Sequence, residues 1–241
     1  MTTKKNSPEK QGDENLAQKA YKSIRKMLFH GEIVPGQKIP YRDLSQKLGM
    51  SPTPVIQALK WLEFQGLVRQ EPNRGCYVEP FSLDEVSQVY DLRQVIELSL
   101  LPEALMRMNE EDQTALKKAL NDHLEADRAS FLNERVLKDM EFHLALASIA
   151  RWHVHLRVLK NLFDLLYLKY RGNYLSARPA EIVDREHEEI VKAVLARDIT
   201  KARDALSLHL TNVKKEVIDN LDRVIKEKKQ PVFSDPFREH S

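Results

Sequence analysis

The chain has 241 residues, of which 42% are hydrophobic and 31% charged, and only 7 are glycines. This length favours two domains with buried cores, and the composition excludes collagen-like and disordered proteins and is typical of a mainly helical one. The formal net charge is +2, but residues 1–80 hold 13 Lys and Arg against 8 Asp and Glu (+5), while the remainder holds 25 against 28 (−3). The basic first part favours attraction to phosphates, although a charge of this size is weak evidence by itself.

The cysteine content and the apolar pattern bear on the compartment. The single cysteine, Cys76, excludes an intrachain disulfide and fits a reducing environment. No run of residues is long and apolar enough to suggest a membrane span. Residues 1–13 are polar and lack the apolar core of a secretion signal, so we expect a disordered arm there. These features predict a cytoplasmic protein without a membrane partner.

Three helices are predicted in the first 80 residues. Apolar side chains at helical spacing predict the first over residues 16–30, and Gly31 is placed to end it. Residues 41–48 predict a short second helix. We expect Ser51 to cap a third helix that starts at Pro52, with its hydroxyl accepting a hydrogen bond from an amide of the first turn.

The third helix is predicted to bury one face and to lead into a hairpin. Its apolar side chains follow the i, i+3, i+4, i+7 pattern of a buried stripe: Val55, Ala58, Leu59 and Leu62. Two β-prone runs, residues 67–68 and 76–78, then surround loop-forming residues 72–75. Helix, helix, tight turn, helix and hairpin together predict a winged helix-turn-helix over residues 14–80.

The outward positions of the third helix are candidates for DNA contact. In a helix-turn-helix this element lies in the major groove with its N-terminal residues over base edges. The outward side chains include Thr53, Gln57 and Lys60. Gln57 can pair with a base edge, and Lys60 can pair with a phosphate.

Other cations of this unit are candidates for the DNA backbone. Arg42 and Lys47 of the second helix can reach phosphates, and Arg74 at the hairpin tip can enter the minor groove. The alternative is that these side chains are solvated charges on a three-helix packing unit. The ordered turn and hairpin favour the DNA-binding interpretation.

From Ser82 onward the pattern predicts helices only. Ser82 and Glu85 form a capping-box pair that opens a helix to about residue 108, with Pro102 as a candidate kink. Further helices are expected over residues 110–129, 133–150, 153–170, 179–196 and 199–226. The predicted fold class is mainly α, with an N-terminal winged helix-turn-helix, a C-terminal all-α antiparallel helical bundle over residues 81–226, and a flexible tail over residues 227–241.

Four residues of the second domain could hold a metal. Asp139 and His143 lie four residues apart on one predicted helix, so both project from one face. His187 and His209 lie on two other helices, and three imidazoles with one carboxylate suit Zn, Ni, Mn or Fe. Spacing alone does not bring them together, and each histidine taken singly is better explained by a structural or surface role.

The first domain resembles the GntR superfamily of regulators. The matching segments, in order, are Pro35-Gly36, Asp43-Leu44-Ser45, Leu48-Gly49-Met50-Ser51, Thr53-Pro54-Val55, Ala58-Leu59, Leu62-Glu63, Gly66-Leu67-Val68 and Arg74-Gly75. The resemblance implies DNA contacts at Arg42 and Ser51, and we add the wing tip, Arg74 and Gly75. The family usually has arginines where this chain has Pro52 and Ile56, so we expect an altered operator or weaker binding.

The second domain resembles the FCD effector domain of the FadR branch, over about residues 83–221. The segments that carry the resemblance are Asp139-Met140-Glu141-Phe142-His143, Glu186-His187-Glu188-Glu189-Ile190, Asp198 with Ala202, and His209-Leu210. The resemblance implies that Asp139, His143, His187 and His209 bind one divalent metal inside the bundle. It also implies that a metabolite carboxylate completes the coordination of that metal.

Two further segments bear on the predicted effector pocket. Leu92-Arg93 with Glu97 resembles the first effector helix of the family, which implies that Arg93 reaches the ligand; the alternative is an ordinary surface pair of Arg93 with Glu97. Arg151-Trp152-His153 stands where the family often has a Gly-Asn turn, which leaves the local pocket shape open.

The sequence thus predicts a homodimeric, sequence-specific transcriptional regulator, not an enzyme, that acts as a repressor. Its expected partners are double-stranded operator DNA and a small organic-acid effector held through a divalent metal. One alternative is a metal-dependent hydrolase or oxygenase, because Asp and His clusters in bundles also support catalysis, although no nucleophile motif is evident. Another is a DNA-binding dimer whose bundle serves only association.

Overall fold

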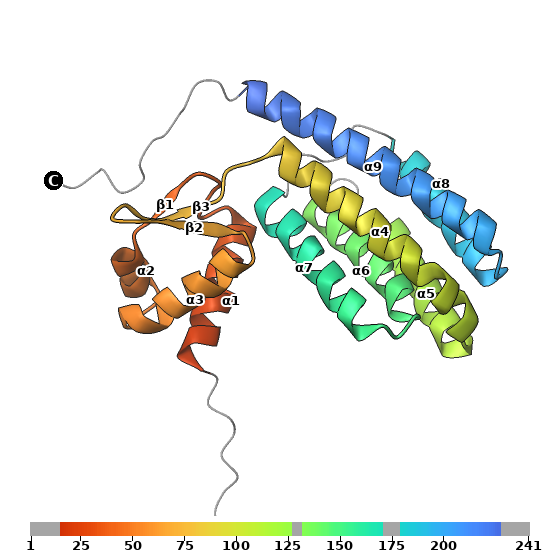
Figure 1. Cartoon of the computed structure of the whole chain (residues 1–241), viewed down its shortest axis with the longest axis horizontal. Coiled ribbons are helices and arrows are strands. Elements are labelled where there is room, and N and C mark those ends of the chain that lie inside the picture. Colours follow the sequence, from red (N-terminus) through yellow and green to blue (C-terminus); the bar gives the residue numbers. More distant parts are fainter. Residues whose placement is uncertain (1–14, 127–131, 171–178, 228–241) are drawn as a thin grey trace, which may run out of the picture. The chain divides into compact units, whose positions relative to one another are not determined.

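A computed structural model describes residues 15–126, 132–170 and 179–227 of the chain (Figure 1). The chain divides between Pro80 and Phe81 into two compact units. The predicted arm at residues 1–13 lies outside the described residues, as does the predicted tail apart from Glu227, which is the last residue of a helix. Among the helices that are described, none combines the length and the apolar character needed to cross a membrane.

The first unit is a winged helix-turn-helix, as predicted. Its elements in chain order are α1 (Leu16–His30), β1 (Lys38–Ile39), α2 (Tyr41–Lys47), α3 (Pro52–Phe64), β2 (Val68–Glu71) and β3 (Gly75–Val78). The strands form an antiparallel sheet in the order β1-β3-β2, with Lys38 opposite Tyr77 and Val68 opposite Val78. Strand β1 was not predicted, because two residues are too few to show an alternating pattern.

The stripe predicted on α3 forms the core of this unit. Val55, Ala58, Leu59 and Leu62 are each at most 1% exposed, and α3 packs against α1. Gly31 and Gly66, at the ends of α1 and α3, have φ values of 70° and 72°, the left-handed backbone that favours glycine at a helix end. The opposite side of α3 carries exposed side chains, among them Thr53, Gln57 and Lys60.

The prediction that the Ser51 side chain caps α3 is wrong. Ser51 occupies the N-cap position, but its side chain makes no capping hydrogen bond. A capping hydroxyl accepts from the second or third amide of the helix, and the third residue here is Pro54, which has no N–H. Thr53 has the only remaining amide that a capping hydroxyl could reach, and Ser51 does not bond to it. The exposed hydroxyl of Ser51 is therefore available to other partners.

The second unit is an all-α bundle, as predicted. Its helices are α4 (Leu83–Arg107), α5 (Glu110–Glu125), α6 (Leu132–Ser148), α7 (His153–Tyr170), α8 (Ala180–Leu195) and α9 (Ile199–Glu227). Helix α9 packs against both α4 and α8, and α6 packs against α4, α5 and α7 (Figure 1). Helix α4 continues through Pro102 without a break. Helix α5 ends at Glu125, earlier than the predicted residue 129, because Ala126 already has a non-helical backbone; residues 127–129 lie outside the described part.

Only half of the capping box predicted at Ser82 forms. The Ser82 hydroxyl accepts from the Glu85 amide at 3.2 Å, as expected. The Glu85 carboxylate, however, contacts Lys169 and Tyr170 at the end of α7, and the Ser82 amide donates to the Tyr170 hydroxyl at 3.3 Å. Tertiary contacts with α7 therefore replace the local bond.

Arg151 takes the backbone conformation that a glycine would favour at the turn before α7. Its φ is 59°, in the left-handed region. The guanidinium donates to both carboxylate oxygens of Asp112, at 3.0 and 2.9 Å, and to the Ile149 carbonyl at 2.6 Å. These bonds offset the cost of about 1–2 kcal/mol for a side chain in this conformation.

Candidate functional site

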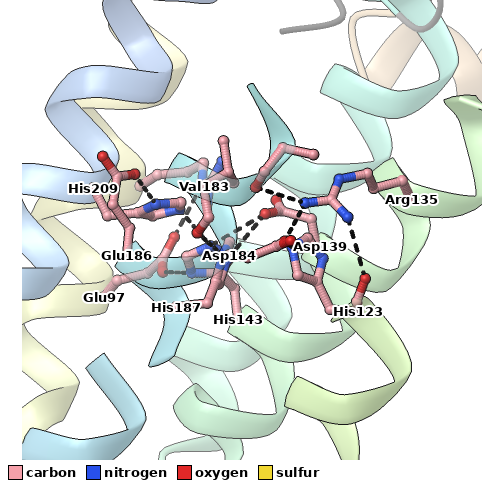
Figure 2. A network of polar contacts seen from close by, with 12 residues as sticks. Glu97, His123, Arg135, Asp139, His143, Val183, Asp184, Glu186, His187 and His209 are labelled. Carbon is pink, nitrogen blue, oxygen red and sulfur yellow. Dashed lines mark hydrogen bonds and ion pairs between the residues drawn. The ribbon is translucent and has the colours of Figure 1, made fainter. Parts of the chain in front are cut away.

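Asp139, His143, His187 and His209, separated by up to 70 positions in the sequence, lie together inside the bundle (Figure 2). Helix α6 contributes the first two, and the packed helices α8 and α9 contribute one histidine each. One ligand atom from each residue lies within 4.8 Å of the others. The convergence that spacing could not establish is thus present in the structure.

The facing atoms of the cluster are the Nε2 atoms of the histidines and a carboxylate oxygen. Asp139 Oδ1 lies 3.1 Å from His187 Nε2 and 3.9 Å from His143 Nε2. The Nε2 atoms of His143 and His209 are 3.3 Å apart. All three imidazoles are at most 1% exposed.

Each histidine is oriented by a hydrogen bond from its other nitrogen. The Nδ1 atom of His143 lies 2.7 Å from Glu97 Oε2, that of His209 lies 2.9 Å from Glu186 Oε2, and that of His187 lies 2.9 Å from the Val183 carbonyl. These three partners can only accept when the carboxylates are ionised, so each Nδ1 carries the proton and each Nε2 presents a lone pair.

This donor set fits a divalent transition metal. Three neutral imidazole nitrogens and a carboxylate oxygen are ligands that Zn, Ni, Mn and Fe accept, and outer hydrogen bonds that fix the tautomer are typical of metal-bound histidines. His187 Nε2 is buried and has no aligned hydrogen-bond partner in the described part of the chain. Burial, followed by the neighbouring His187, lowers the pKa of His209 to about 3, which keeps this imidazole in the neutral form that binds metals.

Arg93 and Glu97 of α4 form a buried ion pair beside the cluster, and the surface-pair alternative is wrong. Both side chains are at most 3% exposed, and Arg93 Nε donates to Glu97 Oε1 at 2.9 Å. Burial alone would raise the pKa of Glu97, but its contacts with His143 and with the charged Arg93 outweigh burial and lower the pKa to about 2. Glu97 is therefore a carboxylate that bridges Arg93 to His143.

The Arg93 guanidinium has unused donor capacity. It lies 4.4 Å from the ring centre of Phe163 and 5.0 Å from that of Tyr90. Its Nη2 atom is buried without a hydrogen-bond partner among the described residues. A buried guanidinium nitrogen in this state suits an anionic oxygen.

A small pocket lies beside Glu97 and His143. Its remaining lining is apolar: Leu100, Leu101, Ala104, Leu146, Ala147 and Leu206. The free space in it is close to the size of one water molecule, so it is far narrower than the pockets that hold drug-sized ligands.

Sequence reasoning missed the roles of two residues around the cluster, Glu186 and His123. Glu186 precedes His187 but faces His209, and it also accepts from Asn212 Nδ2 at 2.8 Å. His123 of α5 is 1% exposed, and its ring centre lies 4.3 Å from that of His187. Burial, followed by His187, lowers the pKa of His123 to about 4. No local pattern marked either residue, because both act across helix packing.

The DNA-contact candidates all lie in the first unit and are all exposed: Arg42, Ser51, Thr53, Gln57, Lys60, Arg74 and Gly75. Arg42 is on α2, Thr53, Gln57 and Lys60 are on α3, and Arg74 precedes β3. Gly75 has a φ of 105°, which the hairpin tip requires and which other residues rarely adopt. Lys47 is paired with Glu32 at 2.8 Å, which makes it a weaker candidate, and the Arg74 guanidinium lies 3.8 Å from the Glu71 carboxylate.

Two family models match this chain. Residues 16–78 match "Bacterial regulatory proteins, gntR family", and residues 88–212 match "FCD domain".

The chain aligns with two curated relatives over most of their length. The HTH-type transcriptional repressor RspR of Escherichia coli (strain K12) is 26% identical over 200 residues, which cover 83% of this chain and 88% of that protein. The HTH-type transcriptional repressor GlaR of the same strain is 29% identical over 198 residues, which cover 79% of this chain and 90% of that protein.

Solved structures share the fold. A GntR regulator from Rhodococcus sp. RHA1 has a TM-score of 0.71 at 20% identity and covers 84% of this chain and 97% of its own. Escherichia coli McbR/YncC has a TM-score of 0.68 at 18% identity, and the match covers 90% of this chain and 100% of that one. At these identities the likeness establishes the fold.

Proposed function

Since this chain belongs to the GntR family of bacterial regulators and carries an FCD domain, we propose that it is a repressor whose helical unit senses a small carboxylate through a divalent metal. The resemblance noted in the sequence is confirmed. The chain is a transcriptional regulator and not an enzyme, which sets aside the hydrolase and oxygenase alternatives. Two of its relatives are named as repressors.

The arrangement of the three imidazoles carries the metal proposal. Asp139, His143, His187 and His209 would hold the ion, because their facing atoms lie within 4.8 Å of one another and the histidine Nδ1 atoms are already committed. When bound, the ion supplies a Lewis-acid centre that attracts carboxylate oxygens. The protein contributes the fixed tautomers and a buried setting.

Arg93 is the proposed second contact for the effector. Its unused Nη2 donor supports a role in binding an anionic oxygen, and Glu97 connects it to His143. Effector binding would shift the relative placement of the two DNA-binding heads of a dimer and so change operator affinity.

Measuring the metal content tests the proposal that the cluster binds a divalent ion. We expect about one divalent ion per chain in purified wild-type protein, by elemental analysis, and its loss in His187→Ala. Glu186→Gln should weaken metal binding roughly 10–100-fold, because it disturbs the group that orients His209. His153→Ala, an exposed histidine at the start of α7, is the matched control. Equal metal content in wild type and His187→Ala would refute the assignment.

A thermal-shift screen of small organic, sugar and amino acids tests the second part. Each acid is measured with and without a chelator, and an effector should raise the melting temperature only when metal is present. Arg93→Met should abolish that shift while retaining metal. If no acid changes the melting temperature or the affinity for operator DNA, the bundle serves only association.

We propose a homodimer, the typical state of regulators that pair their heads on two half-sites. Exposed apolar side chains on one side of α4 support this proposal. Leu92, Val95 and Met106 are 43%, 66% and 67% exposed, and their spacing of three and eleven residues keeps them on one face of the helix. Light scattering after size exclusion measures the mass, and a monomer at micromolar concentration would contradict it.

A further inference from the structure

Helix α3 presents a reading face that contains few charges. Thr53, Gln57 and Lys60 follow the i, i+4, i+7 spacing, and all three are exposed. Among the residues of α3, Pro52–Phe64, there is no arginine, and Lys60 is the only cation. Base contacts come from the N-terminal part of a recognition helix, where this chain has Thr53, Ile56 and Gln57.

The start of α3 also has few amides to offer a phosphate. A helix N-terminus binds phosphate through the free N–H groups of its first turn. Pro52 and Pro54 have none, so Thr53 supplies the only amide among the first three positions. Recognition by this end of the helix therefore depends on side chains more than on the backbone.

The side chains available there match one kind of base pair. Arginine and lysine pair with guanine O6 and N7, whereas glutamine pairs with adenine N6 and N7, and apolar side chains contact the thymine methyl group. Gln57 is exposed, and the neighbouring Ile56 is half-buried, with part of its side chain still accessible. Lys60 lies about 4.5 Å further along the helix axis than Gln57, beyond the N-terminal part that contacts bases, so it is a candidate for a phosphate of the DNA backbone.

We infer that α3 reads A·T base pairs, with Gln57 bonded to an adenine and Ile56 against a thymine methyl group. This inference rests on the proposed operator binding and adds its base preference. It makes Gln57 the residue that determines specificity in α3.

Selection of bound sequences from randomised duplex DNA by the full-length protein tests the inference. The wild type should select a consensus with adenine at one position of each half-site, and Gln57→Ala should lose that preference there while keeping the others. Gln57→Arg should shift the same position toward guanine. Gln18→Ala, an exposed glutamine of α1, is the control and should leave the consensus unchanged.

An atomic test follows on the selected operator. Replacing the assigned adenine by 7-deazaadenine removes the N7 acceptor and should weaken wild-type binding about tenfold by fluorescence anisotropy. Gln57→Ala should bind both duplexes equally, because the contact is already absent. Replacing the neighbouring thymine by uracil should likewise affect the wild type but not Ile56→Ala.

The outcomes distinguish a failure of sequence-specific operator binding from a failure of the base assignment. If no sequence is enriched over random DNA, sequence-specific operator binding fails. If a consensus is enriched but Gln57→Ala leaves every base frequency unchanged, or if the Gln57-dependent position is G·C, the inference is refuted and operator binding stands.

Discussion

The buried pair of Arg93 and Glu97 gives a stability prediction in which one change is harmful and a second repairs it. Arg93→Met keeps an unbranched side chain against Phe163 and Tyr90 but removes the cation. The Glu97 carboxylate then remains buried with His143 as its remaining partner. The double change Arg93→Met with Glu97→Gln removes both charges and keeps an acceptor oxygen for His143.

The expected magnitude follows from burial. Breaking a buried ion pair by removing one partner costs about 3–5 kcal/mol, and the surviving contact with His143 favours the lower end, about 3 kcal/mol. For a unit of this size, such a loss lowers the melting temperature by roughly 6–12 °C. The double variant should recover most of that loss, since no uncompensated charge stays in the interior.

The assay uses one of the chain's two tryptophans as a reporter. Trp61→Phe removes the tryptophan of the first unit, so that Trp152, at the turn before α7, reports the second unit alone. Unfolding is followed by fluorescence in excess chelator, so that metal binding does not contribute to the measured stability.

Two results would contradict this stability prediction. A loss below about 1 kcal/mol in Arg93→Met would mean that the pair behaves as an exposed one. A double variant less stable than Arg93→Met would mean that the uncompensated carboxylate is not the cause of the loss.

Three further predictions concern other parts of the molecule. Burial raises the pKa of Cys76 from 9.0 to about 11, so alkylation near pH 8 should be about a hundredfold slower in folded protein than in urea. The stability that the protonated thiol contributes to the first unit should be complete below pH 9 and lost as the pH rises through 11. Equal alkylation rates in folded and unfolded protein would contradict the burial of the thiol. Ser51→Ala should change the free energy of unfolding by less than about 0.5 kcal/mol, because the Ser51 side chain makes no capping bond. Asn109→Ala breaks a complete capping box with Asp112 and should cost about 1 kcal/mol, and equal losses of the two variants in urea unfolding would contradict the cap assignments. Val95→Glu should lower the mass of the proposed dimer to that of a monomer in light scattering, and an unchanged dimer would place the interface elsewhere.

Local signals predicted most element boundaries. Helices α1 and α7 have the predicted limits, because apolar periodicity and end-forming residues act within a few positions. The absent capping bond of Ser51 was also foreseeable, since Pro54 removes an amide at a known position. The second half of the Ser82 capping box was not, because Lys169 and Tyr170 compete for Glu85 from 84 and 85 residues away.

For the candidate site, residue spacing placed Asp139 and His143 on one helix face and offered His187 and His209 as further candidates, and the resemblance to the FCD domain implied that all four bind one metal. The convergence of the four ligand atoms, and the ring nitrogen by which each histidine faces the others, are visible only once the helices are packed. The same holds for the buried bridge that Arg93 and Glu97 form to His143 instead of a surface pair. The physical reason is that hydrogen bonding and burial in the cluster depend on how α4, α6, α8 and α9 pack, and the period of a single helix carries no information about its neighbours.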